Sequence, residues 1–290
     1  MRSKKPVIFY FRSLDTVGRD DIRFGLLHFG TFATHFKKHL NLQALDFVPV
    51  LGMGAGPLYD QAERAKEFLK NHPQFQKPPG PIHFFGHSAG GLVAKLVAED
   101  PQYQKDLQSL ITIGTPHRSC QAAEWAASLP EANPKVGFLY KLFGYDFSKK
   151  KDLFLSFKKV VEEEFRFPKE VLTGSIICAP PKEKWSWLYR WIHKIPVMKD
   201  FRQPSDGLIQ KDAQYFGDHH WEFELDHIQQ IGFGGQKQEF LRLCTFLETL
   251  WLETENFKEE APSPLQTDQS LRSRAISFNA SFNSARDAES

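Results

Sequence analysis

The sequence predicts an α/β fold with a mostly parallel central sheet flanked by helices. Short apolar runs alternate along the chain with longer segments that carry apolar residues at helical spacing, a pattern typical of strands joined by crossover helices. The chain has 290 residues, 41% of them hydrophobic and 25% charged, which is the composition of a folded protein with one large core. The sequence shows no internal repeats, so we expect one principal domain.

Strands and helices can be assigned from the period of the apolar residues. Strands are expected at Val7–Phe11, Asp46–Leu51, Ile82–Phe85, Leu110–Ile113, Val171–Cys178 and Trp221–Leu225. Helices are expected at Gly30–Leu40, Asp60–Lys70, Gly90–Glu99 and Gln238–Glu253. The last helix contains FLRLCTFLETLWLE, in which the apolar residues recur at helical spacing.

The segment between Ile113 and Val171 is too long for a simple connection between neighbouring strands. Its helical patterns, broken by prolines and a glycine, lie at Cys120–Ser128, Lys135–Phe143 and Lys151–Phe167. We expect a helical lid insertion over about residues 118–168, within a domain that spans residues 1–253. Residues 254–290 are rich in Ser, Ala, Asn and Gln and have no sustained period, which predicts a disordered C-terminal tail.

Charge, cysteines and hydropathy restrict the functional class. The chain has 37 Lys and Arg against 35 Asp and Glu, and this net charge of +2 is too small to indicate a nucleic-acid binder. The three cysteines form no paired motif, which fits a reducing compartment. The apolar run Val7–Phe11 is too short for a secretion signal, and no run approaches the roughly 20 residues of a membrane span. We therefore expect a cytoplasmic protein with no nucleic-acid partner.

The pentapeptide Gly86-His87-Ser88-Ala89-Gly90 lies where a predicted buried strand meets a predicted helix. It fits the G-x-S-x-G nucleophile elbow, in which a tight turn strains the serine backbone and exposes the hydroxyl at the carboxyl end of the sheet. The helix N-terminus behind the turn favours a developing negative charge. Ser88 is therefore the candidate nucleophile, and the alternative is a plain strand–helix turn.

A serine hydroxyl needs a histidine as base and an acid that orients this histidine. His227 follows the strand-like WEFEL and precedes the last helix, where a loop could carry it to Ser88. Asp206, in the turn Pro-Ser-Asp-Gly, is the candidate acid. Asp226 is the rival acid, but adjacent side chains on an extended segment point apart. Other histidines should be solvated or pack: His219 and His220 in a polar turn, and His193 in an aromatic segment.

Four pieces of sequence follow one another in a characteristic order: GHSAG around Ser88, GTPHR from Gly114, SDGLI from Ser205, and Asp226-His227. In this order the chain resembles the bacterial triacylglycerol lipases and their relatives in the α/β-hydrolase superfamily, from about Pro6 to Gly235. The resemblance implies the α/β-hydrolase fold, with Ser88 as nucleophile, Asp206 as acid and His227 as general base. The segment KDLFLSFKKVVEEEFRFP lies where that family has the helix after its lid.

Two backbone N–H groups should form the oxyanion hole. The Ala89 amide, at the start of the helix after Ser88, is one donor. In the lipases the second donor comes from a loop with a His-Gly pair at the end of the first strand, where this sequence has Phe11 and Arg12. Because a backbone amide does not require a particular side chain, the amide of Arg12 or Ser13 is expected to serve. Loss of one donor would cost roughly 10²–10³ in rate.

No metal or other cofactor is expected. Some of these lipases bind calcium partly through an aspartate two residues after the catalytic histidine, where this chain has Gln229, and the other expected carboxylate falls near Lys184. Related enzymes place zinc near the equivalent of His117, but a zinc site takes about three or four ligands and no convincing others are found. His117 is expected to pack and to form hydrogen bonds.

These residues predict a serine hydrolase that cleaves carboxylic esters, with lipid or acyl esters as the expected small-molecule substrates. A thioesterase or acyltransferase would use the same three residues, and an inactive hydrolase fold kept as a binding module is the alternative from another class. The segment WSWLYRWIHKIPV carries aromatic residues at alternate positions: Trp185, Trp187, Tyr189 and Trp191. They could form an acyl-binding wall or make transient contact with a membrane or lipid interface, and edge packing against the sheet is the competing interpretation.

Overall fold

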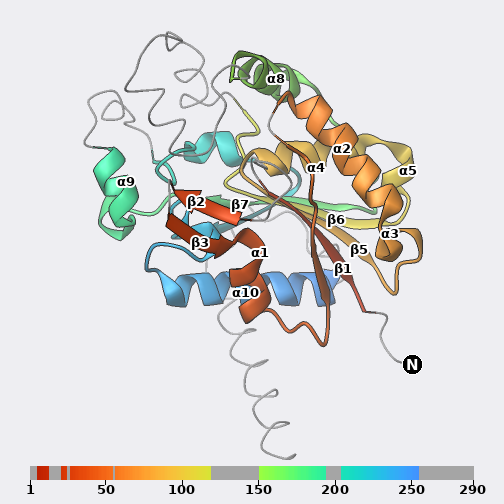
Figure 1. Ribbon diagram of the computed structural model, residues 1–290, viewed down its shortest axis with the longest axis horizontal. Coiled ribbons are helices and arrows are strands. Elements are labelled where there is room, and N and C mark those ends of the chain that lie inside the picture. Colours follow the sequence, from red (N-terminus) through yellow and green to blue (C-terminus); the bar gives the residue numbers. More distant parts are fainter. Residues whose placement is uncertain are drawn as a thin grey trace, which may run out of the picture.

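The central sheet of this computed structural model has six strands, and all of their pairings are parallel. The strands are β1 (Val7–Phe11), β4 (Asp46–Pro49), β5 (Ile82–His87), β6 (Leu107–Ile113), β7 (Leu172–Cys178) and β8 (His219–Phe223). Their order, β4-β1-β5-β6-β7-β8, brings β5 to the interior of the sheet (Figure 1). The structure describes residues 5–12, 21–24, 27–54, 56–118, 150–193 and 204–254.

The predicted strands are confirmed, with shifts at their ends. β5 continues to His87, so extended geometry reaches the residue before Ser88. β8 begins at His219, and the expectation of a polar turn at His219 and His220 was wrong. Both residues pair with β7, opposite Gly174 and Ser175, and these backbone partners come from a distant part of the chain. A hairpin of β2 (Asp21–Phe24) and β3 (Leu27–Thr31) was not predicted.

Both faces of the sheet are buried, as β1 illustrates. Val7, Phe9 and Phe11 belong to the hydrophobic cluster on one face, and Ile8 and Tyr10 to the cluster on the other. All five are fully buried, which explains why this strand is a continuous apolar run rather than an alternation of apolar and polar residues.

Helices cover both faces of the sheet (Figure 1). α2 (Leu58–Asn71) and α4 (Ala89–Glu99) lie on one face, and α1 (Phe32–His39) and α10 (Lys237–Leu252) lie on the other. These four helices confirm the four predicted outside the lid. The remaining short elements are α3 (Pro73–Gln76), α5 (Pro101–Gln104), and the 3₁₀ turns Lys182–Lys184, Lys211–Gln214 and Gln229–Ile231.

One helix of the predicted lid is described. α8 (Lys150–Glu162) coincides with the first part of the segment predicted at Lys151–Phe167, and its Ser156 Oγ accepts the first N–H of α2, from Leu58, at 2.9 Å. Because this N–H has no acceptor within α2, the bond attaches α8 to the main domain. The helices predicted at Cys120–Ser128 and Lys135–Phe143, and the tail after residue 254, lie outside the described residues.

The aromatic segment before Asp206 forms helix α9 (Trp187–Ile192). Residues four apart on a helix share a face. Trp185, just before the helix, and Tyr189 are both buried, whereas Trp187 and Trp191 are 66% and 49% exposed. Packing therefore accounts for half of the aromatic residues. Among the helices that the structure describes, none has the length and apolar character needed to cross a membrane.

Helix α4 approaches β5 and the residues after β6 so closely that glycine is required at positions 86 and 91. A Cβ on Gly86 would lie 2.4 Å from the Cα of Gly91, and a Cβ on Gly91 would lie 2.1 Å from Thr115 Oγ1. A side chain at position 86 would push the helix away from β5, and one at position 91 would push it away from Thr115, which follows β6. Gly56, in the loop before α2, is different, because the nearest atom to its Cβ would be Arg64 Nη2 at 3.8 Å.

We predict that Gly86→Ala lowers the free energy of unfolding by at least roughly 1–3 kcal/mol, because α4 must shift to admit the new methyl group. Urea denaturation should show a lower midpoint with an unchanged slope. Gly56→Ala is the matched control and should keep the wild-type midpoint. Equal midpoints for both variants would contradict the close contact between α4 and β5.

Candidate active site

Ser88 forms the turn between β5 and α4, and its backbone is strained. Its φ is 55° and its ψ is −135°, and within the described part of the chain it is the sole non-glycine residue with a positive φ. Such conformations cost of order 1–3 kcal/mol and persist where neighbouring structure enforces them. Here the Ser88 N–H donates to the carbonyl of Ile113 in β6, and the Ser88 carbonyl accepts from the N–H of Gly91, both at 3.0 Å.

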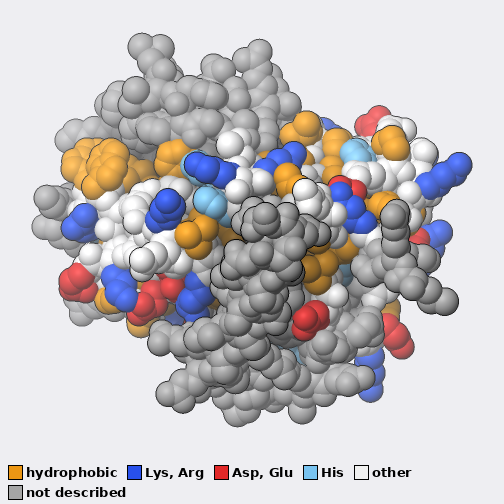
Figure 2. Space-filling model, turned by 90° about the horizontal axis from the view of Figure 1, so that it is seen from below, with side chains coloured by type: hydrophobic (Ala, Val, Ile, Leu, Met, Phe, Trp, Pro, Cys, Tyr) orange, Lys and Arg blue, Asp and Glu red, His pale blue; other side chains and the backbone are white. Residues whose placement is uncertain are grey.

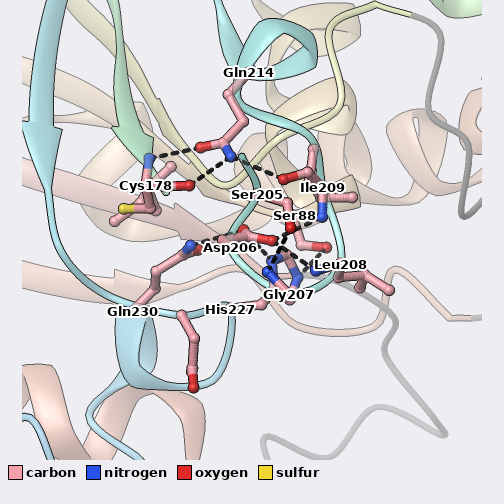
Figure 3. A network of polar contacts seen from close by, with 12 residues as sticks. Ser88, Cys178, Ser205, Asp206, Gly207, Leu208, Ile209, Gln214, His227 and Gln230 are labelled. Atoms are coloured by element: carbon pink, nitrogen blue, oxygen red, sulfur yellow. Dashed lines mark hydrogen bonds and ion pairs between the residues drawn. The ribbon is translucent and has the colours of Figure 1, made fainter. Parts of the chain in front are cut away.

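The imidazole of His227 lies between Ser88 and Asp206 (Figure 3). Its Nε2 is 2.9 Å from Ser88 Oγ, and its Nδ1 is 2.7 Å from Asp206 Oδ2. Because a carboxylate accepts hydrogen bonds, Nδ1 carries the proton, and Nε2 of the neutral ring is then the acceptor for the Ser88 hydroxyl. All three side chains are buried. The structure thus brings the three residues selected from the sequence into one hydrogen-bonded chain.

Asp206 lies in a tight turn that directs its carboxylate at His227. Its Oδ1 accepts the backbone N–H groups of Leu208 at 3.0 Å and Ile209 at 2.7 Å. The backbone carbonyl of Asp206 accepts the N–H of His227 at 2.8 Å, so the two loops are also joined through their main chains. Gly207, with a φ of 94°, has the left-handed conformation that this turn requires.

Gln214 fastens the turn of Asp206 to the end of β7 (Figure 3). Its amide nitrogen donates to the carbonyls of Cys178 at 2.8 Å and Ile209 at 3.1 Å, and its amide oxygen accepts the N–H of Cys178 at 2.7 Å. The side chain is fully buried, so it satisfies backbone groups that water cannot reach. Burial raises the pKa of the Cys178 thiol well above its ordinary value, and this cysteine therefore stays protonated.

His87, the last residue of β5, packs against the ring of His227. The two ring centroids are 4.8 Å apart, and His87 Nε2 donates to the backbone carbonyl of His227 at 3.2 Å. Burial lowers the pKa of His87 well below its ordinary value, and the neighbouring imidazole of His227 acts in the same direction. A neutral His87 with its proton on Nε2 therefore supports the backbone of His227.

The rival acid, Asp226, serves the turn that carries His227. Its carboxylate accepts three backbone N–H groups, from Ser186 at 2.5 Å, Ile228 at 3.1 Å and Gln229 at 2.9 Å. Burial raises the pKa of this carboxyl, and the hydrogen bonds from Ser186 and Gln229 oppose the rise. Asp226 therefore joins the segment before α9 to the turn after β8 and does not orient the imidazole.

Gln229, at the position compared with a calcium ligand, also joins the segment before α9 to the turn that carries His227. Its amide nitrogen donates to the carbonyls of Lys184 at 2.9 Å and Gly234 at 3.3 Å, and its amide oxygen accepts the N–H of Asp226 at 2.8 Å. Gln229 is thus joined by a direct hydrogen bond to Lys184, near which the other expected calcium ligand falls. In the described ranges, no cluster of three or more His, Cys, Asp and Glu side chains could hold a metal ion.

The backbone at the end of β1 lies beside the start of α4. A Cβ on Gly90 would come within 2.3 Å of the Phe11 carbonyl oxygen and 2.6 Å of that of Arg12, so glycine is required there. Ala89 contributes the first N–H of α4, one of the amides that have no acceptor within a helix. Two predicted oxyanion donors, Ala89 and Arg12, therefore lie at the same end of α4, and Ser13 is outside the described residues.

Two other histidines pack as the sequence indicated. His117 stacks on Phe216 with centroids 4.5 Å apart, its Nε2 is 2.8 Å from Thr112 Oγ1, and burial lowers its pKa well below the ordinary value. His193 packs on Trp185 with centroids 4.4 Å apart, and its Nε2 donates to the carbonyl of Gly207 at 2.8 Å. The second contact joins the end of α9 to the turn of Asp206.

Sequence reasoning missed two polar residues of the site, Gln214 and Gln230. Gln230 Nε2 donates to Asp206 Oδ2 at 2.8 Å, beside the bond from His227. No motif marks either glutamine. The available signal was their position: Gln230 lies three residues after His227 and Gln214 eight residues after Asp206, and each has an apolar neighbour.

Comparisons with known proteins agree with this architecture. A family model described as a PGAP1-like alpha/beta domain matches residues 32–128, about a third of the chain. The matched range contains Ser88 and ends before Asp206 and His227. A search of curated proteins gives no significant match.

Solved structures of two lipases and an esterase have similar chain folds. The Staphylococcus hyicus lipase has a TM-score of 0.58 at 12% identity, over 89% of this chain and 98% of its own. A metagenomic carboxyl esterase, MGS0156, has a TM-score of 0.57 at 14% identity, over 89% and 77%. The mature Bacillus licheniformis lipase BlEst2 has a TM-score of 0.55 at 15% identity, over 84% and 93%.

This chain has the α/β-hydrolase fold. The fold implied by the resemblance to the lipases is therefore confirmed. At such low identities the structural likeness extends to the fold alone.

We predict that Gln214→Leu in this α/β-hydrolase fold lowers the free energy of unfolding by roughly 2–4 kcal/mol, because buried backbone groups of Cys178 and Ile209 lose their partner. The measurement is urea denaturation of the purified protein. Gln238→Leu, at an exposed position of α10, is the control and should stay within about 0.5 kcal/mol of the wild type. A Gln214→Leu protein as stable as the control would show that the hydrogen bonds of Gln214 do not stabilise the fold.

Proposed function

We propose that this protein is a serine hydrolase that cleaves carboxylic esters through an acyl-enzyme intermediate. The observation that carries the proposal is the hydrogen-bonded chain from Ser88 through His227 to Asp206, at a turn that strains Ser88. Serine is a favoured N-cap residue, yet the Ser88 hydroxyl forms no capping bond to α4 and contacts a base instead. A strained serine with a buried base suits a nucleophile, whereas a structural turn needs neither feature.

In the proposed mechanism, Ser88 Oγ attacks the ester carbonyl carbon while His227 Nε2 takes the hydroxyl proton. Asp206 holds the Nδ1–H, which keeps the imidazole in the productive tautomer and stabilises its cation. The oxyanion accepts the N–H of Ala89 and that of Arg12 or Ser13. His227 then donates the proton to the leaving alcohol oxygen. Water, deprotonated by the same imidazole, attacks the acyl-enzyme, and the acid and the free Ser88 hydroxyl are released.

We infer that the substrates are lipid or other acyl esters. The support is the class of the proteins with a similar fold, which are named lipases and a carboxyl esterase. A thioesterase or an acyltransferase would use the same three residues and would differ in the acyl donor or the acceptor. The inactive binding module is disfavoured because Ser88, His227 and Asp206 keep hydrogen-bonding distances suited to proton transfer.

We predict that the protein hydrolyses p-nitrophenyl esters and is labelled by a fluorophosphonate, and that Ser88→Ala abolishes both. The loss in kcat should be at least roughly 10⁴-fold, because the nucleophile is removed. Esters of two to sixteen carbons would give the preferred chain length, and acyl thioesters and alcohol acceptors, assayed in parallel, would distinguish the alternatives. A folded wild-type protein that neither turns over nor labels would refute the hydrolase and support the binding module.

The two buried aspartates give a matched control for the acid. Asp206→Asn should lower kcat by roughly 10⁴-fold, because the amide no longer selects the productive tautomer of His227. Asp226→Asn should retain kcat near the wild-type value and lower thermal stability, because Asp226 bonds backbone N–H groups rather than the imidazole. The opposite pattern would assign the acid to Asp226.

We further propose that α9 contacts a lipid surface. Trp187 and Trp191 are exposed on one face of the helix, the exposed Arg190 precedes Trp191 directly, and the exposed Lys182 lies in the turn before the helix. Figure 2 shows hydrophobic side chains gathered at the left edge, over α9, with Lys and Arg side chains nearby. Indole rings and basic side chains together favour the interface of a bilayer that contains anionic lipid.

We predict that the protein sediments with vesicles of phosphatidylcholine and phosphatidylglycerol, and that Trp187→Ser with Trp191→Ser weakens this binding at least roughly tenfold, because two exposed indoles no longer leave water. Leu155→Ser, which removes an exposed apolar side chain from α8, is the control and should bind as the wild type does. Unchanged binding of the double variant would refute the role of α9. A dimer that the double variant separates would assign this face to a second copy of the chain.

A further inference from the structure

Gln230 contacts Asp206, the acid of the proposed triad, at the carboxylate oxygen that accepts no backbone N–H group. Its Nε2 donates to Asp206 Oδ2 at 2.8 Å, the same oxygen that accepts the Nδ1–H of His227 at 2.7 Å. Leu208 and Ile209 donate to the other oxygen, Oδ1. The carboxylate therefore accepts four N–H groups, two on each oxygen, and Gln230 is the one side-chain donor among them that does not take part in proton transfer.

The orientation of the Gln230 amide follows from its partner. A carboxylate oxygen accepts and cannot donate, so the NH₂ end of the amide faces Asp206 and the carbonyl end faces away. Both side chains are completely buried, so water cannot replace this donor. The backbone of Gln230 is fixed as well, because its N–H donates to the carbonyl of Asp226 at 3.0 Å.

Gly114 leaves the space that the Gln230 amide occupies. It follows β6 and has a φ of 54°, and a Cβ at this position would lie 2.2 Å from Gln230 Oε1 and 3.0 Å from Asp206 Oδ2. Any other residue would displace the amide from the carboxylate. Gly114, the first residue of Gly114-Thr115-Pro116-His117, has no reactive group, and packing explains why this position is glycine.

We propose that Gln230 is a positioning residue that holds the Asp206 carboxylate in the orientation His227 requires. This inference rests on the proposed function, in which Asp206 orients the imidazole. A carboxylate can rotate about its Cβ–Cγ bond and exchange its oxygens, and donors on one oxygen alone restrain this rotation weakly. Gln230 adds to Oδ2 a donor other than the imidazole, so the plane of the carboxylate does not depend on the position of the His227 ring alone. The acid therefore keeps its place through the catalytic cycle.

Two substitutions test this role of Gln230: one removes the hydrogen-bond donor, and the other replaces it with a carboxyl group. Gln230→Met keeps the volume and removes the donor, so kcat should fall by roughly 10–100-fold, the usual cost of a hydrogen bond to a charged group, while KM stays near the wild-type value. Gln230→Glu keeps the shape and places a second carboxyl group 2.8 Å from Asp206 Oδ2. Two carboxyls at this distance share a proton, and the protonated form donates to Asp206 as the amide does.

The pH profile of Gln230→Glu should therefore gain a descending limb that the wild type lacks. At low pH the shared proton preserves the contact, and as the pH rises its loss leaves two carboxylates that repel each other. The other titratable groups around the pair are His227, His87, Cys178 and Asp226. All of them are present in both proteins, so a limb confined to the variant reports the substitution at position 230.

Gln229 supplies the matched control, because it is the adjacent glutamine of the same turn and bonds backbone groups instead of Asp206. Gln229→Met should lower thermal stability and leave the pH profile unchanged. All kinetics are measured well below the lowest melting temperature. If Gln230→Met keeps wild-type kcat, or if the profile of Gln230→Glu matches that of the wild type, the proposal is wrong.

A readout independent of turnover separates this inference from the proposed function. In the folded wild type, the proton between His227 Nδ1 and Asp206 should give a resolved downfield signal in the ¹H NMR spectrum. Gln230→Met should shift or broaden this signal, and Gln229→Met should not. A signal that is unaffected by Gln230→Met overturns the positioning role. If the signal responds in a protein without esterase activity, the contact is supported and the proposed function has failed by itself.

Discussion

The turn at Ser88 is the constraint on which the rest of the molecule depends. A strand and a helix that follow each other without a linker must nearly touch, so glycine is required at position 86, where a Cβ would meet the backbone of Gly91. The same compactness forces the residue between them into a strained conformation. The strain can persist because its neighbours are rigid: Ile113 in β6 binds the Ser88 N–H, and both faces of the surrounding sheet are buried under helices. The packing of β1, β5 and β6 therefore maintains the strained backbone conformation of Ser88.

The loops around that turn are joined by neutral amides. Gln214 binds the Asp206 turn to β7, Gln229 binds the His227 turn to Lys184, and Gln230 binds the Asp206 carboxylate itself. A buried charge would need a partner or a metal ion to offset its loss of water, whereas a buried amide needs only a matched donor and acceptor. Each amide here bridges segments that are distant in sequence, so the site is held by contacts that form once the sheet has assembled.

The sequence predicts the strands of the main sheet, the large helices and the three candidate catalytic residues Ser88, Asp206 and His227, because each leaves a local pattern. A buried strand is an apolar run, a helix has its period, and the turn at Ser88 requires glycines. What could not be predicted depends on partners far along the chain. His219 and His220 look like a polar turn until β7 pairs with them, and the alternating aromatic residues of α9 do not reveal that the segment is helical. Gln214 and Gln230 are ordinary polar residues until Cys178 and Asp206 are folded against them.

Two imidazoles in this interior are kept uncharged by the fold. Burial lowers the pKa of His87 and His117 well below the ordinary value of 6.5, with further contributions from His227 to the first and from Lys95 to the second. In the unfolded chain both regain ordinary values and bind protons in acid. Their contribution to stability is therefore complete above about pH 6.5 and is lost as the pH falls toward the lowered values. The proton therefore acts as a ligand that binds the unfolded chain more tightly, and acid shifts the folding equilibrium toward the unfolded state.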